Sequence, residues 1–219
     1  MKSYALFKKD MSSELRTRYA INALAMFIIV TLSIILFSIG NETISQHLTG
    51  GLFWVIIFFT SMSGLSRVFV SEEERGTSLT LQLIAAPSTV FSGKLLFNLI
   101  LVFAMNTVIA ILYSALFDTF VLKNFALFLV SFILSNIGLA FASTIIAAII
   151  SKAGAKGTLY PVLSFPILLP LILTSVQLTL FAMDGTSFET AKFELAIVVC
   201  YDVIIFTVSY LLFDFIWKE

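Results

Sequence analysis

The sequence has little charge and almost no cysteine or histidine. Charged residues make up 12% of the 219 residues and hydrophobic residues 59%, whereas a typical soluble domain is about 25% charged. The single cysteine, Cys200, excludes an internal disulfide and a Cys-x-x-Cys site. With a net charge of zero and a mean hydropathy of +1.05, the composition predicts an all-α, polytopic membrane protein without nucleic-acid binding. We expect one transmembrane domain over residues 1–219.

Recognisable catalytic chemistry is also missing. The segment 154–158 lacks the Gly-x-x-x-x-Gly-Lys-Ser/Thr spacing of a phosphate-binding loop. No nucleophile–base pair and no carboxylate pair indicates catalysis. We therefore expect a chain that is not an enzyme, holds no metal or cofactor of its own, and uses ATP only through a partner.

Six apolar runs are long enough to span a bilayer, which takes roughly 20 residues of helix. They are 19–39, 48–65, 95–116, 125–150, 159–181 and 195–216. The expected organisation is an interfacial arm at 1–18, two spans within 19–66, a cytoplasmic coupling segment at 67–94 and four spans within 95–219. We expect the first run to be an uncleaved anchor, with a cleaved signal peptide as the alternative.

The distribution of Lys and Arg predicts the orientation. With the N-terminus inside, 11 of these residues lie in cytoplasmic segments and only Lys123 and Lys192 lie in outer loops. This positive-inside bias places both termini in the cytoplasm.

The arm before the first run combines a basic flank with an apolar stripe. Phe7, Met11 and Leu15 are spaced i, i+4, i+8, which predicts one apolar face of a helix in the membrane interface. The alternative is an ordinary positively charged flank.

The segment between the second and third runs looks built to meet a soluble partner. Ser71 and Glu74 have capping-box spacing, and acidic residues favour a helix N-terminus. Leu79 and Leu83 continue one helical face, and Pro87 ends the element. We expect a helix beginning near Ser71, although alternating leucines leave the periodicity ambiguous and an acidic run is commonly a solvated turn.

This segment resembles the loop of ABC-2-type transporter permeases. The shared pattern is an acidic run followed by Gly76-Thr77, Pro87 and Gly93-Lys94. Within that group the chain is most similar to the haem exporter protein B (CcmB) family of cytochrome c maturation. The length, the six spans and the proline-rich fifth run over 159–181 carry the narrower resemblance.

The resemblance implies a permease that couples ATP hydrolysis by a separate ATP-binding subunit to haem export or to release of a haem-loaded chaperone. It implies a homodimer beside a haem-handling membrane protein in the bacterial inner membrane, or less favourably in the mitochondrial inner membrane. The alternative is an ABC-2 permease for another hydrophobic or lipid-like substrate. The implied ATPase-subunit interface comprises Glu72, Glu73, Glu74, Arg75, Gly76, Thr77, Leu79, Leu83 and Pro87, and the second cytoplasmic loop offers Lys152, Gly154, Lys156 and Gly157.

Polar and kinking residues inside the spans complete the candidates. Asp202 lies about a third of the way into the sixth run, where a carboxylate usually faces protein or water; the alternative places it near the outer interface. Asn106 is a candidate polar partner on another span, and Pro166 and Pro170 should kink the fifth. His47, in the predicted first outer loop, is a candidate transient haem ligand, although a lone loop histidine is more often merely polar.

Overall fold

The computed structural model confirms the all-α prediction, since the residues it describes form helices and connecting loops without strands. The described residues are 2–40, 42, 44–65, 69, 72, 76–152 and 160–218. The helices are α1 (Lys2–Thr17), α2 (Tyr19–Ile39), α3 (Gln46–Leu65), α5 (Ser78–Ile84), α6 (Pro87–Leu116), α7 (Phe125–Lys152), α8 (Tyr160–Asp184) and α9 (Phe188–Lys218).

Six of these helices are long and apolar enough to cross a membrane, as the six runs predicted. Helix α2 has the predicted bounds, whereas α6 and α9 begin several residues before the predicted starts. Pro87 explains the earlier start of α6. It occupies a first-turn position of the helix, where its missing N–H breaks no backbone hydrogen bond.

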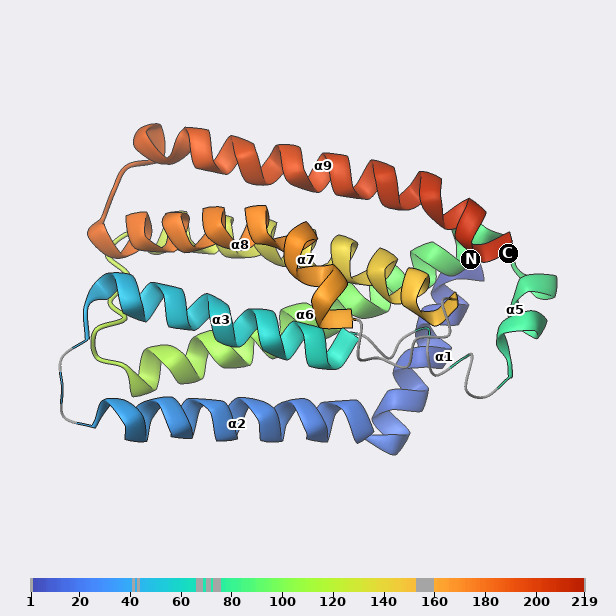
Figure 1. Cartoon of the computed structure of the whole chain (residues 1–219), viewed down its shortest axis with the longest axis horizontal. Helices are drawn as coiled ribbons and strands as arrows, with labels where there is room; N and C mark the ends of the chain where they lie inside the picture. The colour runs from blue at the N-terminus through green and yellow to red at the C-terminus, as the bar shows by residue number, and fades with distance from the viewer. Residues whose placement is uncertain are drawn as a thin grey trace.

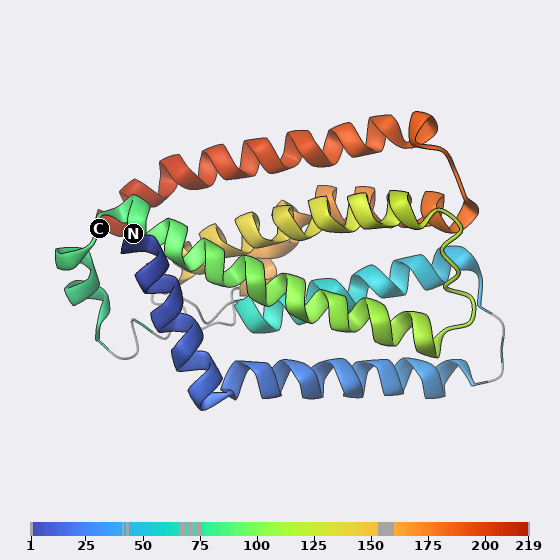
Figure 2. The ribbon, with the colours of Figure 1, turned by 180° about the vertical axis from the view of Figure 1, so that it is seen from behind.

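The long helices lie side by side, and the short ones gather at one end (Figure 1). Both termini, α1 and α5 lie at this end, which we call the α1 end. The start of α3 and the loop joining α8 to α9 lie at the opposite end, which we call the far end. The view from behind shows α1 crossing beside the start of α6 (Figure 2).

Helix α7 forms the centre of the bundle and packs against α6, α8 and α9. Small residues allow this close packing. A Cβ added at Gly138 would lie 2.9 Å from a Leu171 methyl group on α8 and would also meet Asp202 on α9. The small-residue spacing of Gly138 and Ala142 therefore serves packing within one chain here.

Neutral hydrogen bonds tie the helices together toward the far end. The Tyr113 hydroxyl donates to the Thr49 carbonyl at 2.8 Å, and Trp54 Nε1 donates to Thr179 Oγ1 at 2.8 Å. The ring of Phe53 packs against those of Trp54 and Tyr113 in the same layer. These contacts join α3 to α6 and to α8.

The N-terminal arm is helical as predicted, and it packs on the bundle rather than lying free. A Cβ at Gly93 of α6 would lie 2.9 Å from Leu6 Cβ and 3.0 Å from the Ser3 carbonyl oxygen of α1. Arg18, with a φ of 51°, turns the chain from α1 into α2. Glu14 Oε1 accepts a hydrogen bond from the Ile21 N–H at 3.1 Å, which satisfies one free donor at the start of α2.

Candidate functional site at the α1 end

Four charged side chains from three segments meet at the α1 end, and we call them the charge cluster: Lys9, Asp10, Glu72 and Lys94. Lys94 Nζ lies 2.9 Å from Asp10 Oδ2 and 3.1 Å from Glu72 Oε1. Lys9 Nζ lies 2.6 Å from the same Glu72 oxygen and 3.7 Å from Asp10 Oδ1. The cluster is electrically neutral, and it joins α1 to α6 through the segment that precedes α5.

Lys94 is the most unusual member, because only 1% of its surface is exposed. A buried ammonium group is costly unless it is paired, and here two carboxylates pair it. The ring of Phe69 adds a cation–π contact, with its centroid 5.8 Å from Lys94 Nζ. Close approach of α1 at Gly93 brings Asp10 within reach of this ammonium group.

Glu72 links the cluster to the start of the α5 segment. Burial alone would raise the pKa of its carboxyl, but the charge of Lys94 and hydrogen bonds from Lys9, Thr77 and Lys94 lower that pKa to about 2. Thr77 Oγ1 donates to Glu72 Oε2 at 2.5 Å, and the Thr77 N–H donates to the Glu72 carbonyl at 3.0 Å. The carboxylate is therefore held inside the chain.

A second set of contacts, which we call the Trp217 junction, connects α5, α7 and α9. Gln82 Nε2 donates to the Trp217 carbonyl at 2.8 Å, and Lys152 Nζ lies 5.8 Å from the centroid of the Trp217 ring. Phe213 stacks on this ring with centroids 5.5 Å apart. Phe69, which contacts Lys94, also lies 6.1 Å from the Trp217 ring, so the junction and the charge cluster are continuous.

Helix α5 projects from the bundle (Figure 1), and apolar side chains on it are exposed. Leu83 is 89% exposed and Ile84 is 69% exposed, while Gln82 ties the same helix to α9. A tethered helix with exposed apolar residues is suited to contact another protein.

The predicted start of the coupling helix, Ser71, lies outside the described residues. Helix α5 begins at Ser78, and its first turn contains no acidic residue. Gly76 has a φ of +65°, a left-handed conformation that ends a regular helix. Pro87 then opens α6 as well as lying beyond the end of α5.

Of the predicted interface and loop residues, Leu79 belongs to α5. Six others lie outside the described residues: Glu73, Glu74, Arg75, Gly154, Lys156 and Gly157.

Asp202 lies near the middle of α9, 7% exposed. Its Oδ1 faces Gly138 of α7 and finds no hydrogen-bond partner among the described residues. The expected amide partner is used elsewhere, since Asn106 Nδ2 donates to Asn136 Oδ1 at 2.6 Å.

Pro166 and Pro170 lie inside α8, whose first turns bend away from the rest of the helix (Figure 1). The Tyr201 hydroxyl of α9 donates to the Ile167 carbonyl at 3.1 Å. A proline weakens backbone bonding in the turn before it, so this side chain supplies a donor where the helix is irregular.

His47 lies in the first turn of α3 rather than in a loop, which corrects the predicted placement. Its side chain is exposed, and the start of α3 lies at the far end. In the described ranges no group of three His, Cys, Asp or Glu side chains could hold a metal ion.

The sequence analysis did not identify Lys9 and Asp10 as members of the charge cluster, or Trp217 as the centre of the junction. A signal was present in Lys94, which directly precedes the third apolar run, because a charge buried beside a membrane span needs a partner of opposite charge. Spacing could not say which of the 13 acidic residues provides it.

Six long apolar helices and a charged junction at one end define a multi-pass helical membrane protein. A family model described as the CcmB protein matches residues 1–213. The chain therefore belongs to the CcmB family, whose members are permease components of haem transport in cytochrome c maturation. A sequence comparison with curated proteins gives no match.

Proposed function

We propose that the chain is the permease subunit of an ABC transporter complex in which a separate subunit binds and hydrolyses ATP. The observation that carries the proposal is α5, which exposes Leu83 and Ile84 while Gln82 fastens it to the bundle. The ATP-binding subunit docks on this helix and on the second cytoplasmic loop that the sequence predicts. Two copies of the chain engage two such subunits.

Coupling then follows the contacts of the α1 end. Movement of the segment before α5 acts on Lys94 of α6 through Glu72, and movement of α5 acts on α9 through the hydrogen bond from Gln82 to Trp217. Asp10 brings α1 into the same unit. ATP-driven displacement of the partner is thereby transmitted to two long helices at once.

The complex uses ATP hydrolysis either to export haem or to release a haem-loaded chaperone next to a haem-handling membrane protein. ATP-driven haem flux in vesicles, compared with ATP-driven chaperone release by the same complex, distinguishes the two.

The α1 end faces the cytoplasm of a bacterium, and the far end, with His47, faces outward across the inner membrane. Cysteines placed at positions 47 and 186 should react from outside, and one at position 83 only from inside.

The docking proposal is tested by replacing Leu83 and Ile84 with serine and measuring co-purification of the ATP-binding subunit. We expect strong loss of the partner, because the exposed apolar contact is removed without touching the bundle core. Leu48→Ser is a matched control, since Leu48 is also an exposed apolar residue near a helix end, at the far end. Equal partner recovery from the double variant and the control would overturn the docking site.

A further inference from the structure

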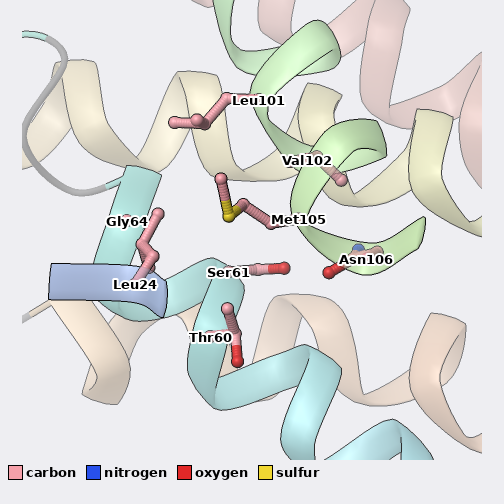
Figure 3. Close-up of a pocket in the computed structure, with 8 residues that line it drawn as sticks. All are labelled: Leu24, Thr60, Ser61, Gly64, Leu101, Val102, Met105 and Asn106. Atoms are coloured by element: carbon pink, nitrogen blue, oxygen red, sulfur yellow. The ribbon is translucent and has the colours of Figure 1, made fainter. Parts of the chain in front are cut away.

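A small pocket lies between α2, α3 and α6 (Figure 3), and its lining residues do not belong to the charge cluster. Its volume is about 10 Å³. The polar lining comes from Thr60 and Ser61 of α3 and Asn106 of α6, and the rest is apolar. Met105 contributes its sulfur-bearing side chain to the wall.

Three deeply buried oxygens in this pocket have no partner within the described part of the chain: Thr60 Oγ1, Ser61 Oγ and Asn106 Oδ1. Two of them matter here: Ser61 Oγ, on a residue 5% exposed, and Asn106 Oδ1, on a residue 0% exposed. Figure 3 shows these oxygens directed toward one another across the pocket. The amide nitrogen of Asn106 is already used, since it donates to Asn136 Oδ1.

Asn106 Oδ1 can only accept a hydrogen bond, and no described group donates one to it. A buried polar atom left without a partner costs roughly 1–3 kcal/mol. A water molecule can donate one hydrogen to this oxygen and exchange a second hydrogen bond with the Ser61 hydroxyl. A buried water needs about two to four polar partners and about 10–15 Å³ of free space, and the pocket provides two facing oxygens and about 10 Å³.

We propose that this pocket binds one water molecule, which bridges Ser61 Oγ to Asn106 Oδ1. The water extends a hydrogen-bonded path that continues from Asn106 to Asn136 and from the Asn136 amide to the Phe132 carbonyl at 2.6 Å. Helix α3 is thereby joined to α6 and α7 inside the membrane. The few oxygens of the pocket do not fit Ca²⁺, which takes six to eight oxygen ligands.

Thr60 provides a matched control from the same wall. Its hydroxyl is also buried and unpartnered, but Figure 3 shows it turned away from the Ser61 and Asn106 oxygens. Removing it with Thr60→Val keeps the shape of the side chain and should leave the water in place. Ser61→Ala removes one of the two partners and should release the water.

The test is X-ray radiolysis of the full chain in lipid nanodiscs, in which bound water generates hydroxyl radicals that oxidise adjacent side chains. Met105 reports on the pocket. Met26, 61% exposed on α2, serves as the reference, because it faces outward from the bundle rather than into the pocket. Oxidised fractions are measured by mass spectrometry, and helix content is checked for each variant.

We expect severalfold more oxidation at Met105 than at Met26 in the unmodified protein. Ser61→Ala should lower oxidation of Met105 to the level of Met26, and Thr60→Val should leave it high. Equal oxidation of the two methionines in the unmodified protein would overturn the proposal, and this comparison needs no variant to fold. Unchanged Met105 oxidation in Ser61→Ala, or an equal loss in Thr60→Val, would overturn it as well.

Discussion

The two ends of the bundle are joined by different kinds of polar contact. At the α1 end, Lys94 is buried between the carboxylates of Asp10 and Glu72. Toward the far end, the buried links are neutral, as in the hydrogen bonds from Tyr113 to Thr49 and from Trp54 to Thr179. The contacts that depend most on charge therefore lie next to α5, the proposed docking helix.

The two kinds of contact differ in how much stability is lost when one partner is removed. Removing one member of a buried ion pair leaves an uncompensated charge and costs about 3–5 kcal/mol. Removing one neutral hydrogen bond within a membrane protein costs about 0.6 kcal/mol on average. The α1 end should therefore be tightly specified but sensitive to pH and substitution, and the far end should tolerate single changes.

The largest effect should come from Lys94→Met, which removes the central cation and leaves Asp10 without its close partner. We expect the free energy of unfolding to fall by about 3–5 kcal/mol, measured by denaturant titration in mixed micelles. Lys192→Met is the control, because the pair of Lys192 with Glu189 is 74% and 88% exposed and should contribute less than about 1 kcal/mol. Similar losses in the two variants would remove the contrast between the ends.

A smaller effect should come from acid. Glu72 has an ordinary pKa of 4.5, lowered to about 2 in the folded chain. The stabilisation it gives is fully present above pH 4.5 and is lost as the pH falls toward 2, by about 3 kcal/mol at most. Melting temperatures across this range should fall less steeply for Glu72→Gln. A matching change in Glu189→Gln, at an exposed site, would show that Glu72 is not the group responsible.

The centre of the bundle should respond to volume rather than charge. In Gly138→Ala the added Cβ meets Asp202 Oδ1 and the Leu171 side chain, and overpacking of this kind costs about 1–3 kcal/mol. Gly51→Ala, with open space around the added Cβ, should be neutral or stabilising in the same unfolding measurement. Equal stability of the two variants would contradict the close contact between α7 and α9.

The smallest effect should come from Trp54→Phe, which removes the indole N–H and keeps a large ring. Thr179 retains a second hydrogen bond, to the Ser175 carbonyl, so we expect a loss of about 1 kcal/mol or less. A loss as large as that of Lys94→Met would show that neutral contacts specify the far end as strongly as ions specify the α1 end.

The sequence was sufficient for the parts of the fold that depend on local composition. Apolar runs predicted six long helices, because each run alone meets the length that a bilayer requires. The start of α5 was missed because Gly76 adopts a positive φ, whereas the acidic spacing before it matched a helix start. The capping pattern predicted a helix start, but residue spacing does not reveal the left-handed backbone at Gly76.

The candidate site depended more on contacts between distant segments. Pairing of Lys94 with Asp10 requires α1 to cross α6 at Gly93, and nothing local in either segment specifies that crossing. Trp217 matched the pattern of a belt residue, yet it is 4% exposed and contacts both α5 and α7. Tertiary packing gave these residues their surroundings.

The position of the buried cation along the chain bears on how the protein is made. Synthesis proceeds from the N-terminus, and both carboxylates that pair with Lys94 precede it in the sequence. When α6 leaves the ribosome, its ammonium group finds Asp10 and Glu72 already synthesised. The first half of the protein can neutralise its most costly charge before α7, α8 and α9 exist. The rings of Phe213 and Trp217 pack later against Phe69, the aromatic contact of Lys94.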